Sequence, residues 1–204
     1  PKTPKPHRLY RELIIKKHKI MACENLSKGR LNPCKTVGGL KNIYFVNFDS
    51  ATYGAMTLDA DEQITAFGSA QTLFKYELRG VQSIDETNEN NADSGSSFWT
   101  AAGTITLKSQ DLATRKELKL MSYGRPLVIT EDFNGVFKLF GAQNGCDVSV
   151  GTASGAAMGD FNGYNLSIAA NEKEPAFFID STIIDDTTNT VVTDEVAAPD
   201  TEVP

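Results

Sequence analysis

The chain has 204 residues, of which 40% are hydrophobic and 23% charged, and its formal net charge is −6. This length and composition suit one globular domain with a sizeable core, with or without extensions. No run of about 18 apolar residues occurs, so a transmembrane helix is not expected. The first residues lack the apolar block and cleavage site of a secretory signal, so we expect the protein to remain where it is made.

Charge is distributed unevenly along the chain. Residues 1–20 contain seven Lys or Arg and one Glu, a net charge of +6, whereas the other residues carry thirteen basic and twenty-five acidic side chains. This asymmetry predicts a basic N-terminal extension over 1–20, which is either a solvated leader or an arm that docks on an acidic surface or on nucleic acid. Leu9, Leu13 and Ile14 have helical spacing, which predicts a short amphipathic helix after Pro6.

Beyond a turn-rich stretch at 32–42, the chain predicts β-structure. Short runs rich in aromatic and β-branched residues occupy 42–48, 52–58 and 62–67. The next strand is expected at 73–81, where alternation predicts one buried and one solvated face. The buried face contains Phe74, Tyr76 and Leu78, and the solvated face contains Lys75, Glu77 and Arg79.

A second alternating strand is expected at 103–109. Ile105 and Leu107 face one way, and Thr104, Thr106 and Lys108 face the other.

The stretch 83–99, between these two strands, is almost entirely polar. It cannot bury enough apolar surface to order alone, so we expect a long loop from Asp85 to Ser97 that is either mobile or functional. Trp99, beside this loop, is the aromatic residue expected to anchor an interface. The candidate contact residues of the loop are Asp85, Glu86, Asn88, Glu89 and Asp93.

One helix of about three turns is predicted within 109–124. Ser109 is the expected N-cap, and Asp111 suits the first turn because a carboxylate there is attracted by the helix dipole. Gly124 and the following Pro end the helix. Its apolar side is expected to contain Leu112, Leu118 and Met121.

Three Asn-Gly pairs, at 134–135, 144–145 and 162–163, predict frequent chain reversals. Asn-Gly supplies the two positive-φ residues of a type I′ turn, so the first pair is expected to close a hairpin and the second to send the chain back again. The strands expected around these turns are 126–132, 136–142, 146–150, 164–170 and 176–180.

These elements together predict a mainly β protein over 21–186, an antiparallel β-sandwich or barrel-like domain with one flanking α-helix. Residues 187–204 are expected to form an exposed acidic C-terminal tail, with a late strand at 182–185 or 190–193 as a further option.

No catalytic residue, cofactor site or metal site is predicted. Both histidines, His7 and His18, fall in the basic extension, which leaves the domain without an imidazole for nucleophilic catalysis or zinc. The three cysteines lack metal-ligand spacing and are expected to be reduced. Asp59, Asp61 and Glu62 could act as a glycosidase pair, but a turn between two strands is the favoured explanation. Aromatic residues at 74, 76, 177 and 178 are expected in the core.

Two stretches, "LATRKELKLMSYGRPLVITEDFNGVFKLFGAQNG" and "TASGAAMGDFNGYNLSIAANEKEPAFFI", resemble the C-terminal half of tail tube proteins of tailed bacteriophages, especially those of Bacteroidetes hosts. The earlier "SKGRLNPCKTVGGLKNIYFVNF" resembles the beginning of the same proteins. The resemblance spans most of 21–180 and consists of turns and strands without a catalytic signature.

This resemblance implies a structural virion protein that assembles in the host cytoplasm and resides in the tail. Subunits of the family form hexameric rings whose inner strands join into one barrel, and the rings stack into a tube that conducts DNA without sequence-specific binding. Homo-oligomers, other virion proteins and passing DNA are the implied partners, with no membrane. In this setting, the alternating strands at 73–81 and 103–109 are expected to contribute to the inner sheet, and the 85–97 loop is expected to reach an adjacent subunit.

Two other roles remain open at this point. The first is a head-tail connector or capsid-associated protein of similar β build. The second is a carbohydrate-binding or hydrolytic β-sandwich, for which the turn carboxylates and Trp99 are the supporting residues.

Overall fold

The computed structural model describes residues 28–32, 35–49 and 55–193 of the chain. The chain forms two units, 1–35 and 36–204. In the first unit the described residues, 28–32 and 35, are exposed, and the expected basic extension with its amphipathic helix lies outside the described residues. The helices and strands discussed below belong to the second unit.

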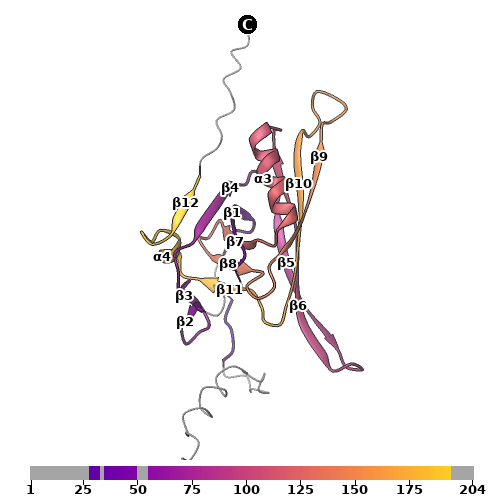
Figure 1. Cartoon of the computed structure of the whole chain (residues 1–204). Coiled ribbons are helices and arrows are strands. Elements are labelled where there is room, and N and C mark those ends of the chain that lie inside the picture. Colours follow the sequence, from indigo (N-terminus) through magenta and orange to yellow (C-terminus); the bar gives the residue numbers. More distant parts are fainter. Residues whose placement is uncertain (1–27, 33–34, 50–54, 194–204) are drawn as a thin grey trace, which may run out of the picture. The chain divides into compact units, whose positions relative to one another are not determined.

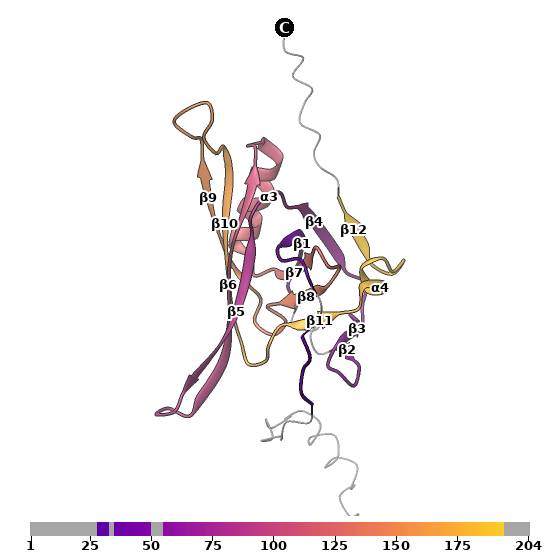
Figure 2. The same cartoon turned by 180° about the vertical axis from the view of Figure 1, so that it is seen from behind.

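The second unit is mainly β, as predicted, and consists of two sheets with a flanking helix, α3 (Leu112–Tyr123) (Figures 1 and 2). Sheet A has the strand order β12-β4-β1-β7-β8-β11-β3-β2, and sheet B has the order β5-β6-β10-β9. Neither sheet closes into a barrel within the described residues. The β11–β3 and β12–β4 pairs of sheet A are parallel, and the other pairs are antiparallel.

The bounds of the strands follow the expected runs closely in most places. Sheet A contains β1 Leu40–Val46, β2 Thr57–Leu58, β3 Ile64–Ala66, β4 Thr72–Glu77, β7 Leu127–Asp132, β8 Phe137–Phe140, β11 Phe177–Ile179 and β12 Thr190–Val192. Sheet B contains β5 Ser83–Asn91, β6 Ser96–Lys108, β9 Asp147–Ala153 and β10 Gly163–Glu172.

Sheet A is buried on both faces near its centre. The face toward sheet B contributes Ile43 and Phe45 to a first hydrophobic cluster, core 1. The opposite face contributes Tyr44 and Val46 to a second cluster, core 2. A strand that is buried on both faces has a nearly continuous run of apolar residues instead of an alternating pattern. This explains why β1 and β7 are rich in apolar residues.

The predicted faces of β4 are therefore correct only in part. Tyr76 and Leu78 pack in core 1, as expected, but Leu73 on the other side of the strand is fully buried in core 2. The face expected to be solvated is solvated only toward its end, where Glu77 and Arg79 are exposed, while Lys75 is half-buried.

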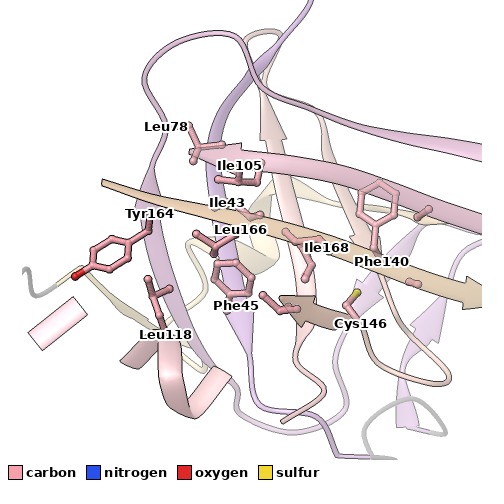
Figure 3. Close-up of a cluster of buried hydrophobic side chains, with 14 residues drawn as sticks. Ile43, Phe45, Leu78, Ile105, Leu118, Phe140, Cys146, Tyr164, Leu166 and Ile168 are labelled. Atoms are coloured by element: carbon pink, nitrogen blue, oxygen red, sulfur yellow. The ribbon is translucent and has the colours of Figure 1, made fainter. Parts of the chain in front are cut away.

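Core 1 fills the space between sheet A, sheet B and α3. Figure 3 shows Phe45 of β1 and Leu118 of α3 beside the inward residues of β6 and β10. These inward residues are Ile105, Tyr164, Leu166 and Ile168, all buried. The predicted inward orientation of Ile105 and Leu107 is thus confirmed, since both pack in this cluster.

Helix α3 begins later than predicted. Its N-cap is Asp111, whose Oδ1 accepts a hydrogen bond from the Thr114 N–H at 2.7 Å, whereas Ser109 has a left-handed φ of 69°. Gly124 ends the helix, as expected. Leu118 and Met121 pack in core 1. Leu112, expected on the same side, is instead 85% exposed, because it lies on the opposite side of the helix.

The first Asn-Gly pair closes the β7–β8 hairpin, as predicted, but not by a type I′ turn. Of the pair, only Gly135 has a positive φ, 76°. Asp132 Oδ1 accepts hydrogen bonds from the N–H groups of Asn134 and Val136, both at 2.8 Å, and the Gly135 N–H donates to the Asp132 carbonyl at 3.2 Å. This pattern is a three-residue loop with glycine at its left-handed position.

The second Asn-Gly pair does not form a hairpin. It lies in the corner through which the chain leaves β8 in sheet A and enters β9 in sheet B. Gly141 and Gly145 both have positive φ, and a Cβ at Gly141 would lie 2.6 Å from Cys146 Sγ. The corner therefore requires glycine for its conformation and for the close approach of the buried thiol, whose pKa is raised by burial to about 12.

The stretch 83–99, expected to be a loop, is a β-hairpin. Strands β5 and β6 pair in register from Ser83–Thr104 to Asn91–Ser96, and the turn occupies 92–95. The prediction of a loop from the polar composition was wrong. Pairing between the two strands satisfies the hydrogen bonds of the backbone and does not require apolar side chains.

The C-terminal part of the described chain continues sheet A. The 182–185 option for a late strand is wrong, because Ser181–Ile184 form a single helical turn, α4, whose Ile183 and Ile184 pack in core 2. The 190–193 option is confirmed by β12, which pairs with β4. Phe178, expected in the core, is 49% exposed beside Lys138, whereas Phe177 is buried.

A buried carboxylate joins β1 to β7. Glu131 accepts hydrogen bonds from Asn42 at 2.6 Å, from Lys41 at 2.7 Å and from Tyr44 at 2.8 Å. Burial opposes the charged form of Glu131, but the hydrogen bonds from Asn42, Lys41 and Tyr44 outweigh it and lower the pKa of the carboxyl. Tyr44 keeps its proton because burial and the bond to Glu131 raise its pKa.

Replacing Glu131 with Ala is expected to lower the free energy of unfolding by about 3 kcal/mol, because Asn42 and Tyr44 are left as buried donors without an acceptor. Urea denaturation measures this loss. Glu131→Gln, which keeps one acceptor, should cost less. Since the pKa is lowered, the contribution should be complete above the ordinary value of 4.5 and disappear as the pH falls through the lower folded-state value. A loss for Glu131→Ala below about 0.5 kcal/mol contradicts this account.

Candidate assembly interface

Sheet B presents one face to core 1 and the other to solvent. Because side chains alternate along a strand, the neighbours of the inward residues form a second face of small polar or apolar side chains. Its centre consists of Ala102, Thr104, Ser149, Ser167 and Ala169, all exposed. We call this surface the open face, since among the described residues it carries neither a helix nor a second sheet.

The charged residues of the open face lie at its margins. Asp85 and Glu89 lie on β5, Asp147 on β9 and Lys108 at the end of β6, which gives a small excess of negative charge. An open hollow of about 440 Å³ lies over the β5 side of this face and is lined by Asp85, Thr104 and Ser167, among others. The open face therefore carries few charges, and most of them are acidic.

Among the described residues, no strand pairs with the outer edge of β5 or with the outer edge of β9. The Thr106 N–H donates to the Gln82 side chain at 3.1 Å, on the β5 side of β6. Since backbone groups of successive residues point to opposite edges of a strand, the even-numbered residues of β6 face β5. The partners of these residues in β5 are odd-numbered, so the backbone groups of the even-numbered residues of β5 point away from the sheet. The same alternation, followed through β10, shows that the even-numbered residues of β9 also point away from the sheet. These edge residues are Ile84, Glu86, Asn88 and Asn90 of β5, and Val148, Val150 and Thr152 of β9.

The structure places most of the predicted contact residues on one hairpin. Asp85 and Glu89 point to the open face, while Glu86, Asn88 and Trp99 point to the other side of the strands. Beyond the pair formed by Asn88 and Trp99, the sheet narrows to two strands, because β10 ends at Glu172, opposite Trp99.

We call residues 89–98 the arm. All of them are exposed, including Asp93 in the turn and the 40%-exposed Phe98, and none belongs to either core. An isolated two-stranded hairpin is only marginally stable in water, so the arm gains stability from any surface that covers it.

Two carboxylates fix the base of the hairpin to the loops of sheet A. Glu86 Oε1 accepts a hydrogen bond from the Ala176 N–H at 2.6 Å. Glu172 accepts from the N–H groups of Gln143 and Asn144, the shorter bond being 3.0 Å. Burial raises the pKa of Glu172, while the two N–H groups partly offset this effect. These bonds attach the end of sheet B from which the arm projects to the loops of sheet A.

Trp99 and these glutamates also line a small cavity, which bears on the carbohydrate alternative. Its volume is about 10 Å³, which is room for about one water molecule and not for a sugar ring. Two of its carboxylates, Glu86 and Glu172, are already bound by backbone N–H groups.

The other predicted residues lie on sheet A. Lys75, Glu77 and Arg79 belong to β4 and the turn after it, so the two strands expected to form one inner sheet fall in different sheets. Thr104 and Thr106 do lie on the open face, although Thr106 is half-buried because its N–H, carbonyl and hydroxyl bind Gln82.

The acids at 59, 61 and 62 form a turn between β2 and β3, as the favoured explanation predicted. Asp59 Oδ1 accepts from the N–H groups of Asp61 and Gln63, both at 2.9 Å. Among the described residues there is no group of His, Cys, Asp or Glu that could hold a metal ion. Within the same ranges, no helix is long and apolar enough to cross a membrane.

The sequence did not predict that the open face forms one continuous surface. The alternation that places Thr104 and Thr106 on one side of their strand was the local signal for a polar face. Ser149, Ser167 and Ala169 lie in the predicted strands at 146–150 and 164–170, but the pairing of those strands with β6 was not apparent. Comparison of the chain with protein-family models, with curated proteins and with solved structures finds no match.

Proposed function

We propose that this protein is a structural subunit that assembles into rings through the edges of sheet B, and that the rings stack into a bacteriophage tail tube. The observation that carries the proposal is a four-stranded sheet whose two edges are unpaired, and whose face of small side chains is uncovered, within the part of the chain that the structure describes. Long exposed edges favour aggregation unless another strand pairs with them. The sequence resemblance to tail tube proteins supplies the type of assembly, including hexameric rings.

The strand directions support joining β9 of one copy to β5 of the next. All neighbours in sheet B are antiparallel, so β9 runs antiparallel to β5. Copies in the same orientation can therefore continue one antiparallel sheet from subunit to subunit. Such a head-to-tail contact closes into a ring when the rotation between copies permits closure.

The open face supports a role in lining a channel. In a closed ring one face of sheet B turns inward, and the face opposite core 1 is the one left uncovered. Few cations and an acidic margin keep a polyanion such as DNA from binding tightly.

Electron microscopy of the purified full chain in negative stain tests the proposal. Hollow rings or tubes are the expected result, and their assembly should not require DNA. A monodisperse monomer at all concentrations and salt conditions tested contradicts it.

The arm gives a separate prediction about stacking. Replacing 90–97 by Asn-Gly joins Glu89 to Phe98, which are directly opposite each other in the hairpin. Two opposite residues can be connected by a two-residue turn, and Asn-Gly favours such a turn. The free energy of unfolding should change by less than about 1 kcal/mol, because the arm contributes to neither core. Tubes should be replaced by separate rings in micrographs, because a contact between rings is lost.

The matched control is Asp93→Asn, which keeps the length of the arm and should still form tubes. Tubes of normal length from the shortened variant would show that the arm does not join rings.

A further inference from the structure

Helix α3 carries an outer stripe on the side away from core 1. Its apolar members are Leu112, Leu120 and Tyr123, which are 85%, 57% and 79% exposed. Its cations are Arg115, Lys116 and Lys119, all exposed. With 3.6 residues per turn, these six side chains occupy the half of the helix opposite Leu118 and Met121.

No carboxylate lies within the stripe. Glu117 lies on the flank of the helix near Tyr76, whose pKa is raised by burial first and by the charges of Glu117 and Asp111 second. Asp111 caps the helix. Among the described residues, no salt bridge involves Arg115, Lys116 or Lys119. The stripe therefore combines exposed apolar area with unpaired positive charge, in a chain whose net charge is −6.

Charge decides between the two chain ends as occupants of the stripe. Residues 1–20 carry a net charge of +6, which has the same sign as the charge of the stripe. Residues 194–204 contain four acids and no Lys or Arg, and their acids are interleaved with apolar residues. Those acids are Asp194, Glu195, Asp200 and Glu202.

The path of the chain leads from β12 toward α3. Strand β12 runs parallel to β4, with Val192 opposite Phe74. Two residues further along β4 is Tyr76, which packs in core 1 together with Leu118 and Met121 of α3. The eleven residues 194–204 span at most about 36–40 Å when extended, and a helix of twelve residues is about 18 Å long. The extended segment is therefore about twice as long as the helix.

We propose that residues 194–204 bind along the outer stripe of α3 in the same molecule. The acids of the segment pair with the three cations of the stripe. Its apolar residues contact Leu112, Leu120 and the ring of Tyr123. The contact is intramolecular, so it benefits from an effective concentration on the order of millimolar. This inference is independent of the proposed tube function.

Lysine acylation of the full chain, read by mass spectrometry, tests the proposal. Lys116 and Lys119 should react slowly in the natural chain. In a variant with Asp194→Asn, Glu195→Gln, Asp200→Asn and Glu202→Gln, both should react about threefold faster, as expected for the loss of weak exposed ion pairs. Lys108, exposed on sheet B, is the internal reference.

Asp61→Asn with Glu62→Gln is the matched control, because it removes exposed acids from the turn between β2 and β3 and should leave the reactivity of Lys116 and Lys119 unchanged. Protection should be the same across a dilution series. Unchanged reactivity in the four-acid variant overturns the proposal. Protection that grows with protein concentration overturns it in favour of a neighbouring copy, and protection that requires added duplex DNA overturns it in favour of a polyanionic partner.

Discussion

Replacing Thr152 with Pro on the edge of β9 is expected to abolish rings and tubes while the subunit remains folded. The N–H of Thr152 points away from β10, so proline removes a donor that only an added strand could use. Asn88→Pro on β5 should act in the same way from the other edge. Losing such hydrogen bonds and obstructing the approach of the strand should cost about 3 kcal/mol per contact, which corresponds to about a 100-fold higher concentration for assembly.

Sedimentation velocity measures this shift, and circular dichroism reports whether the subunit is still folded. Thr152→Val and Asn88→Thr are the matched controls, because both keep the backbone N–H and favour strands. Rings that form at the natural concentration in both proline variants would exclude pairing through these edges.

If the open face lines the channel of the proposed tube, introducing lysine there should make assembled tubes retain DNA. Ala102→Lys combined with Ser149→Lys places two cations on the open face, one on β6 and one on β9, at positions that are exposed. Repeated around a ring, these cations neutralise phosphates and release counterions. Retention of short duplex DNA by assembled tubes should rise about tenfold or more at low salt and fall steeply as salt is added.

Co-sedimentation of labelled DNA with tubes measures retention. Ala102→Gln with Ser149→Gln, which is polar but neutral, is the matched control and should behave like the natural chain. If the lysine variant forms intact tubes that retain no more DNA than this control, the open face does not line the channel.

The sequence was sufficient to predict the class of the fold and most strands, because alternation and Asn-Gly pairs are local signals. Phe45 and Ile105 lie in runs whose β character is evident without knowledge of their partners. The exception is 83–99, whose strands are polar on both sides. Its order comes from the pairing of Asn88 with Trp99 and of Glu86 with Ala101, which no local pattern reveals.

The candidate interface was less predictable for a related reason. Asp85, Glu86 and Trp99 were predicted as contact residues, but which of them share a face depends on strand register. The edges of sheet B depend on the order of the strands, which requires the chain to cross from β8 to β9 at Gly141–Gly145. An Asn-Gly pair alone does not distinguish such a crossing from a hairpin, since glycine permits both.

The register of sheet B has one further consequence. The turn of the arm lies beyond the Ser96 end of β6, whereas the loop between β9 and β10 lies beside the Lys108 end, so the two project in opposite directions (Figures 1 and 2). A filament of copies in one orientation is consequently polar: one terminus displays arms and the other displays the β9–β10 loops with the fully exposed Met158. In the proposed tube, growth and capping at the two termini would therefore use different contacts, and a cap that recognises one terminus would not recognise the other.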